Sequence, residues 1–151
     1  MDGGERAELG AKIAYVSRQW RRVVDTRLNA YGLTEATWLP LLHLARARAP
    51  MRQKDLAASL TLDSSSVVRI LQGLENERLI ERREDADDRR AKTIELTDEG
   101  RRRVKEVEAV ASAVREELLG PVPDADIAAA TRILTTICDR LCRMTEEANA
   151  E

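Results

Sequence analysis

The sequence predicts a mainly α-helical protein with one small β-hairpin, and three observations support this fold class. Apolar residues recur three and four positions apart over most of the 151 residues, which is the spacing of amphipathic helices. Glycine and proline, which interrupt helices, number only 7 and 4. One stretch, Lys92–Leu96, instead alternates apolar and polar residues as a half-buried strand does. Together these features predict about six helices and one hairpin.

The first predicted helix covers about residues 8–31 and is followed by Gly32, a candidate C-cap. Thr34 opens a second helix that runs to about Arg48. Pro40 lies inside this second helix and is expected to bend it or to disturb its early turns. The apolar stripe of the first helix consists of Leu9, Ile13, Val16, Trp20, Val24, Leu28 and Tyr31.

Two short helices follow the break at Pro50. The first covers about Arg52–Leu60, and residues 61–62 form a tight connector. Asp63 is a good N-cap for the second helix, which covers about Ser64–Arg78. Two short helices joined by such a turn form a helix-turn-helix.

Two strand-like segments come next, Leu79–Arg83 and Lys92–Leu96, and they flank a loop of charged and small residues at 84–91. A hairpin directly after a helix-turn-helix is a wing. The sequence therefore predicts a winged helix-turn-helix over residues 33–97.

Two long helices complete the chain, and the segment 120–123 (Gly-Pro-Val-Pro) separates them. Thr97 caps the first, and the second begins after Asp124. Their apolar residues alternate three and four apart, as in coiled coils: Val104, Val107, Ala111, Val114 and Leu118, then Ile127, Ala130, Leu134, Ile137, Leu141 and Met144. Residues 8–32 and 98–147 are thus expected to form a helical dimerisation region within a single domain spanning residues 1–151.

The composition excludes several classes of function. No run of 18 apolar residues exists, so no membrane partner is expected. The N-terminus lacks a signal-peptide pattern, so a cytoplasmic location is expected. With one histidine, no phosphate-cradling glycine loop and no metal-ligand spacing, we expect no catalytic residue, no metal and no cofactor.

The predicted helix over residues 64–76 has one apolar face and one polar, acid-free face. Arginine can form two hydrogen bonds with guanine, and glutamine and asparagine can pair with adenine. The three serines lie at the N-terminus of this helix, where free backbone N–H groups can bind a phosphate. These features favour DNA reading; the alternative is a solvated helix face. The candidate contacts on this helix are Ser64, Ser65, Ser66, Arg69, Gln72 and Asn76, and Gln53 is a further candidate at the start of the preceding helix.

The wing supplies a second set of candidate DNA contacts, although its alternative interpretation is a solvated charged turn. Arg89 or Arg90 can enter a minor groove from the hairpin tip, and Asp88 is expected to hold the Arg90 guanidinium through a forked ion pair. On the strands, the candidates for phosphate contacts are Arg82, Arg83 and Lys92. The net charge of the chain is −2, so DNA binding must rest on local patches of positive charge.

These segments resemble the MarR family of transcriptional regulators. The wing signature is carried by residues 88–92 (Asp-Arg-Arg-Ala-Lys) and by Ile94, Leu96, Thr97 and Gly100. The helix-turn-helix pattern is carried by Leu56-Ala57, by Ser65-Ser66-Val67-Val68-Arg69 and by Leu74-Glu75. A likeness to the SlyA-like branch is carried by Leu9-Gly10, Trp20-Arg21, Arg27-Leu28, Leu33-Thr34 and Trp38. The resemblance covers about residues 9–145.

The resemblance implies a homodimer that binds a pseudo-palindromic operator in double-stranded DNA, with Arg69 in the major groove and Arg90, positioned by Asp88, in the minor groove. It also implies a repressor that is relieved by a small aromatic or phenolic acid. The candidate ligand residues are Tyr15, Arg18, Trp38 and His43. Their alternative roles are an aromatic core contact, a surface arginine and an ordinary helical histidine. Repression or activation depends on the position of the operator, which the sequence does not contain.

Two features depart from the family or leave alternatives open. Arg78 stands where many relatives have glycine; a left-handed backbone there costs about 1 kcal/mol or more, and the alternative is that Arg78 adds a phosphate contact. Cys138 and Cys142 are expected to be small buried residues, and the alternative is a redox switch across the dimer. A winged-helix module that binds protein is the remaining rival function.

Overall fold

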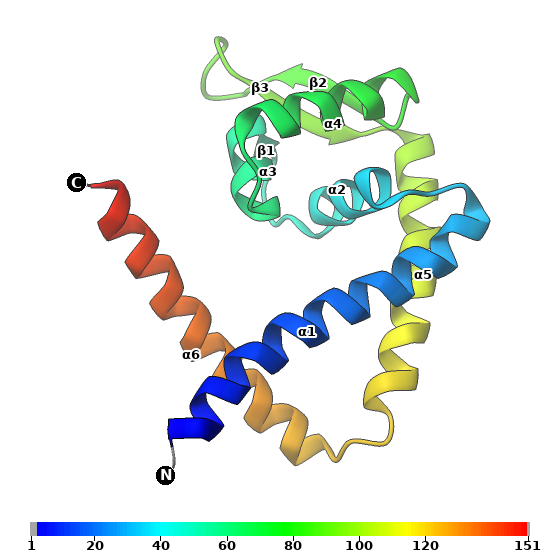
Figure 1. The fold of residues 1–151 in the computed structure, drawn as a ribbon. Coiled ribbons are helices and arrows are strands. Elements are labelled where there is room, and N and C mark those ends of the chain that lie inside the picture. The colour runs from blue at the N-terminus through cyan, green and yellow to red at the C-terminus, as the bar shows by residue number, and fades with distance from the viewer. Residues whose placement is uncertain (1–2, 151) are drawn as a thin grey trace. The chain divides into compact units, whose positions relative to one another are not determined.

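The computed structural model describes residues 3–150. Within them it confirms a mainly α-helical fold with a small antiparallel sheet (Figure 1). The elements are α1 (Gly3–Leu28), the 3-10 helix η1 (Asn29–Tyr31), α2 (Glu35–Arg46), β1 (Met51–Arg52), α3 (Gln53–Leu60), α4 (Ser64–Asn76), β2 (Ile80–Glu84), β3 (Lys92–Leu96), α5 (Asp98–Leu119) and α6 (Asp124–Asn149).

The chain divides into two compact units within α5, after Ser112. The first unit contains α1, the helix-turn-helix of α3 and α4, the sheet and the first part of α5. The second unit contains the end of α5 and α6. No helix within the described residues is both long enough and apolar enough to cross a membrane.

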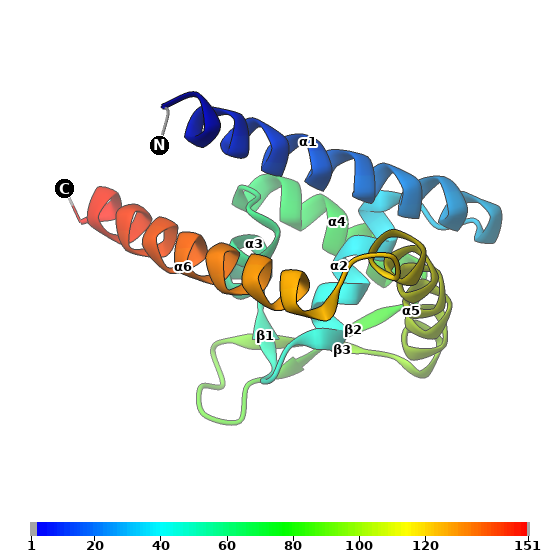
Figure 2. The same ribbon diagram turned by 90° about the horizontal axis from the view of Figure 1, so that it is seen from below.

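The predicted hairpin is present, but the sheet has a third strand that the sequence pattern did not reveal. The strand order is β1-β3-β2, and both pairs are antiparallel. Strand β1 contributes only two residues, Met51 opposite Ile94 and Arg52 opposite Thr93. A strand of two residues shows no alternation of apolar and polar positions, so local sequence does not predict it. The loop between β2 and β3 projects away from the helix-turn-helix in both views (Figures 1 and 2).

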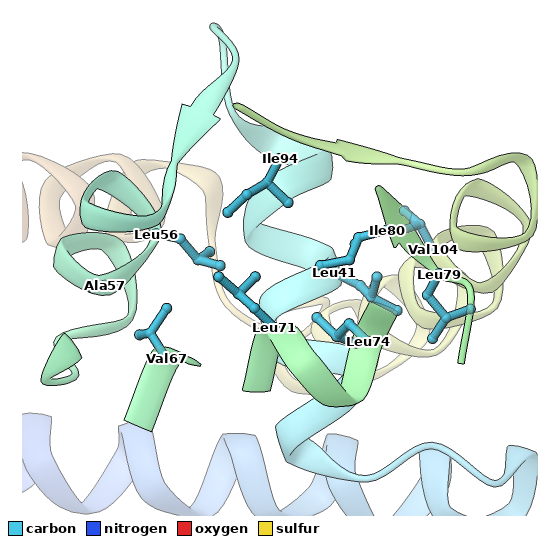
Figure 3. Packing of buried hydrophobic residues seen from close by; sticks show 10 residues of the cluster. All are labelled: Leu41, Leu56, Ala57, Val67, Leu71, Leu74, Leu79, Ile80, Ile94 and Val104. Atoms are coloured by element: carbon cyan, nitrogen blue, oxygen red, sulfur yellow. The ribbon is translucent and has the colours of Figure 1, made fainter. Parts of the chain in front are cut away.

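The helix-turn-helix and the sheet enclose one apolar core (Figure 3). Leu56 of α3 and Leu71 of α4 are fully buried in it together with Leu41 of α2. The sheet contributes Ile80 and Ile94, and α5 closes the cluster with Val104. Burial of one face of α4 in this core leaves its opposite face exposed, which is what positions the site. Helix α2 is continuous across Pro40, which is buried.

Three helices in the first unit end in the same hydrogen-bonded motif. After η1, Gly32 takes a left-handed backbone with φ of 71°, which confirms the predicted C-cap. At the end of α4, Arg78 has φ of 58°, its N–H donates to Glu75 O at 2.9 Å, and Leu79 N–H donates to Leu74 O at 2.9 Å. This pair of bonds is a Schellman motif, in which glycine is the preferred left-handed residue. Thr61 ends α3 in the same way, with φ of 52°.

Replacing Arg78 with glycine is expected to raise the free energy of unfolding by about 0.5–1 kcal/mol. Glycine removes the clash of Cβ in the left-handed conformation, and its greater freedom in the unfolded chain offsets part of this gain. Urea unfolding measures the difference. Arg78→Ala is the matched control because it retains Cβ, and it is expected to leave stability nearly unchanged. A glycine variant less stable than the alanine variant would contradict the assigned strain.

The start of α5 is held against the end of α4. Thr97 caps α5 as predicted, because Gly100 N–H donates to its Oγ1 at 3.0 Å. The Thr97 hydroxyl donates to Arg78 O at 2.7 Å, and Thr97 N–H donates to Leu79 O at 3.1 Å. A Cβ atom on Gly100 would lie 2.0 Å from that same Leu79 oxygen. The junction therefore requires glycine at position 100.

Helices α1 and α6 expose most of their predicted apolar stripes. In α1 only Val24 and Leu28 are buried, and α6 has no buried residue among those described. The exposed residues of these stripes include Leu9, Ile13 and Val16 on α1 and Leu134, Leu141 and Met144 on α6, and Val23 and Ile133 are exposed beside them. Amphipathic helices derive most of their stability from burying such a face.

Candidate nucleic-acid interface

Helix α4 presents the predicted polar face to solvent. Val67, Leu71 and Leu74 are buried beneath it, which fixes the rotation of the helix. Arg69, Gln72 and Asn76 are exposed on the opposite side. None of these three side chains has a hydrogen bond or ion pair within residues 3–150. Their donors and acceptors are therefore available to base edges and phosphates.

The N-terminus of α4 already holds a carboxylate. Asp63 accepts the Ser66 backbone N–H at 2.8 Å, which confirms the predicted N-cap. It also accepts the hydroxyls of Ser65 at 2.7 Å and of Ser66 at 3.1 Å. The bond from Ser65, followed by those from Ser66, lowers the pKa of Asp63 to about 2. The serine contacts to phosphate remain predictions, and a phosphate bound there would lie beside a negative charge.

Several candidate phosphate contacts on the strands are engaged with acids of the same chain. Arg82 donates to Glu75 and, at 3.5 Å, to Gln53 Oε1. Arg83 donates to Glu81 Oε1 at 2.7 Å and lies 3.3 Å from Glu95 Oε2. Both arginines remain candidate DNA contacts, but each must release a protein partner to bind phosphate.

At the wing tip, Asp88 shapes the backbone of the turn. Its Oδ1 accepts the backbone N–H of Arg90 at 2.9 Å, and its carbonyl accepts Ala91 N–H at 3.0 Å. The expected forked ion pair between Asp88 and the Arg90 guanidinium is not among the interactions of the described chain. Asp88 therefore orients Arg90 through the backbone, as an Asx turn does.

The basic side chains of the wing loop and of the start of β3 are exposed and have no acidic partner within the described residues: Arg89, Arg90 and Lys92. Segment 64–92 has equal numbers of acids and bases. Pairing of Glu75 with Arg82 and of Glu81 with Arg83 neutralises two acids and two bases of this segment, and only Asp85 pairs with an arginine from outside it, Arg52. The wing segment 84–92 also holds Glu84, Asp87 and Asp88, so it carries no excess of positive charge. Its basic side chains, and Arg69 on α4, are therefore available to DNA as individual groups and not as a basic patch.

Two charged residues at the wing were missed by sequence reasoning. Arg52 of β1 donates from Nε to Asp85 Oδ2 at 2.9 Å, and Asp85 is the first residue after β2. Backbone donation by Asp87, then the bond from Arg52, holds the pKa of Asp85 below its usual value. The two residues lie 33 positions apart. No local signal predicts such a pair, because it depends on the unexpected strand β1.

None of the four candidate ligand residues lines either of the two cavities of the first unit described below. Trp38 is buried and its Nε1 donates to Asp25 Oδ1 at 3.0 Å, so the core-contact alternative describes its present role. His43 lies against the Ser59 hydroxyl, and burial, Arg21 and Arg46 lower its pKa. Tyr15 and Arg18 are exposed on α1. The ligand assignment remains a prediction.

Two cavities of the first unit are lined by other residues. A groove of about 540 Å³ lies between the end of α2, β3 and the start of α5, with Leu44, Pro50 and Leu96 among its apolar walls. A smaller pocket of about 260 Å³ is formed by α1, α2, α3 and α4, with Arg21 and Glu35 at its charged side. Neither cavity was predicted, because each joins segments distant in sequence.

The cysteines are not buried as expected. Cys138 and Cys142 are both exposed in the single chain, where α6 has no buried residue among those described. Their redox role remains an untested alternative. Across the described part of the chain, no group of three or more histidine, cysteine, aspartate or glutamate side chains is placed to hold a metal ion.

Comparison with known proteins identifies the same family as the sequence motifs. A family model described as MarR family matches residues 31–91, which include the helix-turn-helix, β2 and the wing loop up to the start of β3. The crystal structure of the transcriptional regulator PA3341 is 38% identical, with a TM-score of 0.84, and the match covers 89% of this chain and 98% of that chain.

Two further solved structures share the fold. CouR from Rhodococcus jostii RHA1, bound to p-coumaroyl-CoA, is 27% identical over 85% of this chain and 90% of that chain, with a TM-score of 0.76. S. aureus MepR, solved with DNA, is 24% identical over 85% and 93% of the two chains, with a TM-score of 0.75, and shows likeness of fold alone. SlyA, at 18% identity, likewise shares only the fold, so the SlyA-like branch remains a prediction.

Proposed function

Because the chain belongs to the MarR family of DNA-binding transcriptional regulators, we propose that it binds a pseudo-palindromic operator as a homodimer in the cytoplasm. Members of this family are transcriptional regulators and not enzymes. Two copies of α4 would enter successive major grooves about 10 base pairs apart, and the two wings would reach the flanking minor grooves.

The observation that carries this proposal is the distribution of unpaired polar groups. Arg69, Gln72 and Asn76 project from a helix whose other face is buried, and Arg89 and Arg90 project from the wing without acidic partners in the described chain. In the proposed complex Arg69 and Gln72 read base edges, and Arg90 occupies the minor groove. The rival function, docking of a protein partner, would not require this arrangement of arginine and amide groups.

Selection of bound duplexes from a random DNA pool tests the proposal. The expected product is a sequence with two inverted half-sites centred about 10 base pairs apart. Affinity for that duplex should fall steeply as salt concentration rises, because phosphate contacts release counterions. A pool that yields no enriched sequence, or binding that is insensitive to salt, would count against operator recognition.

The homodimer is supported by the uncovered apolar faces of α1 and α6. A second copy is the occupant that we propose for these faces, since they continue the three-four spacing of coiled coils. Large apolar patches left exposed to solvent are uncommon on stable monomers.

Replacing Leu141 with aspartate is expected to weaken dimerisation by about 100-fold or more. An unpaired carboxylate within an apolar interface loses its hydration without compensation. Analytical ultracentrifugation measures the change, and operator affinity should fall with it. Ala128→Asp, on the opposite side of α6 by helical spacing, is the matched control and should remain dimeric. Two variants with the same dimerisation constant would contradict the assigned face.

The proposed regulation is repression that a small aromatic or phenolic acid relieves. This part of the proposal rests on family membership and on CouR, which was solved with an aromatic acyl-CoA ester. Tyr15, Arg18, Trp38 and His43 remain the proposed contacts. Titration of salicylate-like acids against tryptophan fluorescence and operator affinity tests it, and no change in either signal would contradict it.

A further inference from the structure

The wing loop is internally ordered by its own backbone. Asp85 N–H donates to Ala91 O at 3.0 Å, which closes the loop at its base. Asp87 N–H donates to Asp85 Oδ1 at 2.8 Å, and Arg90 N–H donates to Asp88 Oδ1 at 2.9 Å. These bonds define the shape of the loop. They do not fix its orientation relative to α4, because every partner lies within the loop itself.

A contact from outside the loop is supplied by Arg52. Its Nε and Nη2 atoms each lie 2.9 Å from Asp85 Oδ2. The two side chains are 32% and 13% exposed, which makes this pair more sheltered than most ion pairs of the chain. Asp85 uses its second oxygen for Asp87, so one carboxylate joins the loop to β1.

Arg52 is itself held at the start of the helix-turn-helix. It pairs with Thr93 in the sheet, and its backbone N–H donates to Asp55 Oδ2 at 2.9 Å in the first turn of α3. A path of direct contacts thus runs from α3, through Arg52 and Asp85, to the turn that carries Arg90. Loss of the ion pair would leave the loop attached only through β2 and β3.

We propose that Arg52 and Asp85 form a positioning pair for DNA binding, which holds the wing loop in the orientation that presents Arg90 to the minor groove. This inference rests on the proposed operator binding. The pair does not need to touch DNA, because the Arg52 guanidinium is already engaged with an acid. A loop freed from it would have to be ordered during binding, which lowers affinity.

Variants that change charge in opposite directions separate positioning from simple electrostatics. Arg52→Gln removes a positive charge and Asp85→Asn removes a negative one. Positioning predicts that both variants bind the selected operator about tenfold more weakly. A purely electrostatic effect predicts weaker binding for Arg52→Gln and tighter binding for Asp85→Asn. Opposite signs for the two variants would therefore overturn the proposal.

A double-mutant cycle with Arg90→Ala tests whether the Arg52–Asp85 pair affects operator affinity through Arg90. In the Arg90→Ala background, Asp85→Asn should lower operator affinity by less than about a further twofold, because the contact between the wing and the minor groove is already absent. An equal loss in both backgrounds would show that the pair acts on the fold rather than on the wing, and would overturn the inference. Glu108→Gln is the matched control. It disrupts the ion pair between Arg46 and Glu108, at 3.0 Å, which joins α2 to α5, and should leave operator affinity unchanged in both backgrounds.

Hydrogen exchange of the DNA-free protein gives an independent readout. Both Arg52→Gln and Asp85→Asn should accelerate exchange of the amides in residues 86–91, while the amides of α4 remain protected. Unchanged exchange in the wing loop would contradict the proposed restraint. Failure of wild-type protein to bind any selected duplex would refute the proposed function, whereas wild-type binding that depends on Arg90 but not on Arg52 or Asp85 would refute this inference alone.

Discussion

Replacing Arg90 with alanine is expected to weaken operator binding by about 100-fold. Its side chain is exposed and has no acidic partner in the described chain, so its charge is available to DNA. A specific arginine contact contributes about 1–3 kcal/mol, and a dimer loses two such contacts at once. Fluorescence anisotropy with a labelled operator duplex measures the loss. Stability should be unaffected, because the guanidinium makes no hydrogen bond or ion pair within residues 3–150.

Arg102→Ala is the matched control for Arg90→Ala. It removes the same charge from the surface, but Arg102 lies on α5 and its guanidinium donates to Glu99. Operator affinity is expected to change by less than about twofold, as for a screened surface charge. Arg69→Ala should weaken binding and relax the preference for particular base pairs, since Arg69 is assigned to the major groove. Equal affinity of the Arg90→Ala variant and wild type would refute the wing assignment.

Gly100→Ala is expected to destabilise the fold by about 3 kcal/mol or more. The added Cβ would lie 2.0 Å from the Leu79 carbonyl oxygen, a backbone atom that cannot turn aside as a side chain does. That oxygen also accepts Thr97 N–H, so any relief of the clash disturbs the junction of α4, β2 and α5. Because the clash is with a fixed backbone atom, the loss of stability is expected at the upper end of the range for overpacking substitutions. Urea unfolding measures the loss.

Gly73→Ala is a control for which the expected change in stability has the opposite sign. Gly73 lies inside α4, and a Cβ atom there meets nothing within 4 Å. Alanine has a higher helix propensity than glycine, so this variant is expected to be about 1 kcal/mol more stable than wild type. If both alanine variants changed stability in the same direction, close approach at Gly100 would not be the cause.

Much of the fold was predictable because its determinants are local. The stripe of Val67, Leu71 and Leu74 predicted both the existence of α4 and its buried face, and Asp63 and Thr97 predicted the two caps correctly. The end of α4 was less predictable. Its pattern suggested a helix to Arg78, whereas the chain leaves the helix at Asn76 and turns through a left-handed Arg78.

The candidate site was predicted in outline and corrected in detail. Residues of the reading face and wing were recognised from their chemistry and order, but sequence did not distinguish arginines that are engaged from those that are not. Arg82 and Arg83 have acidic partners, and the pairing of Asp88 with the Arg90 guanidinium is replaced by a backbone hydrogen bond. The strand β1 and the contact between Arg52 and Asp85 were not foreseen at all.

The amino-acid sequence by itself determined the order of the helices, the hairpin, the caps and the acid-free face of α4, because each depends on residues within a few positions of one another. The tertiary structure alone decided which charges remain unpaired and how the wing is held. Those properties depend on contacts across long separations, 33 residues for Arg52 and Asp85 and 62 for Arg46 and Glu108. Such pairs form only when packing of the apolar core brings distant segments together, so no local pattern encodes them.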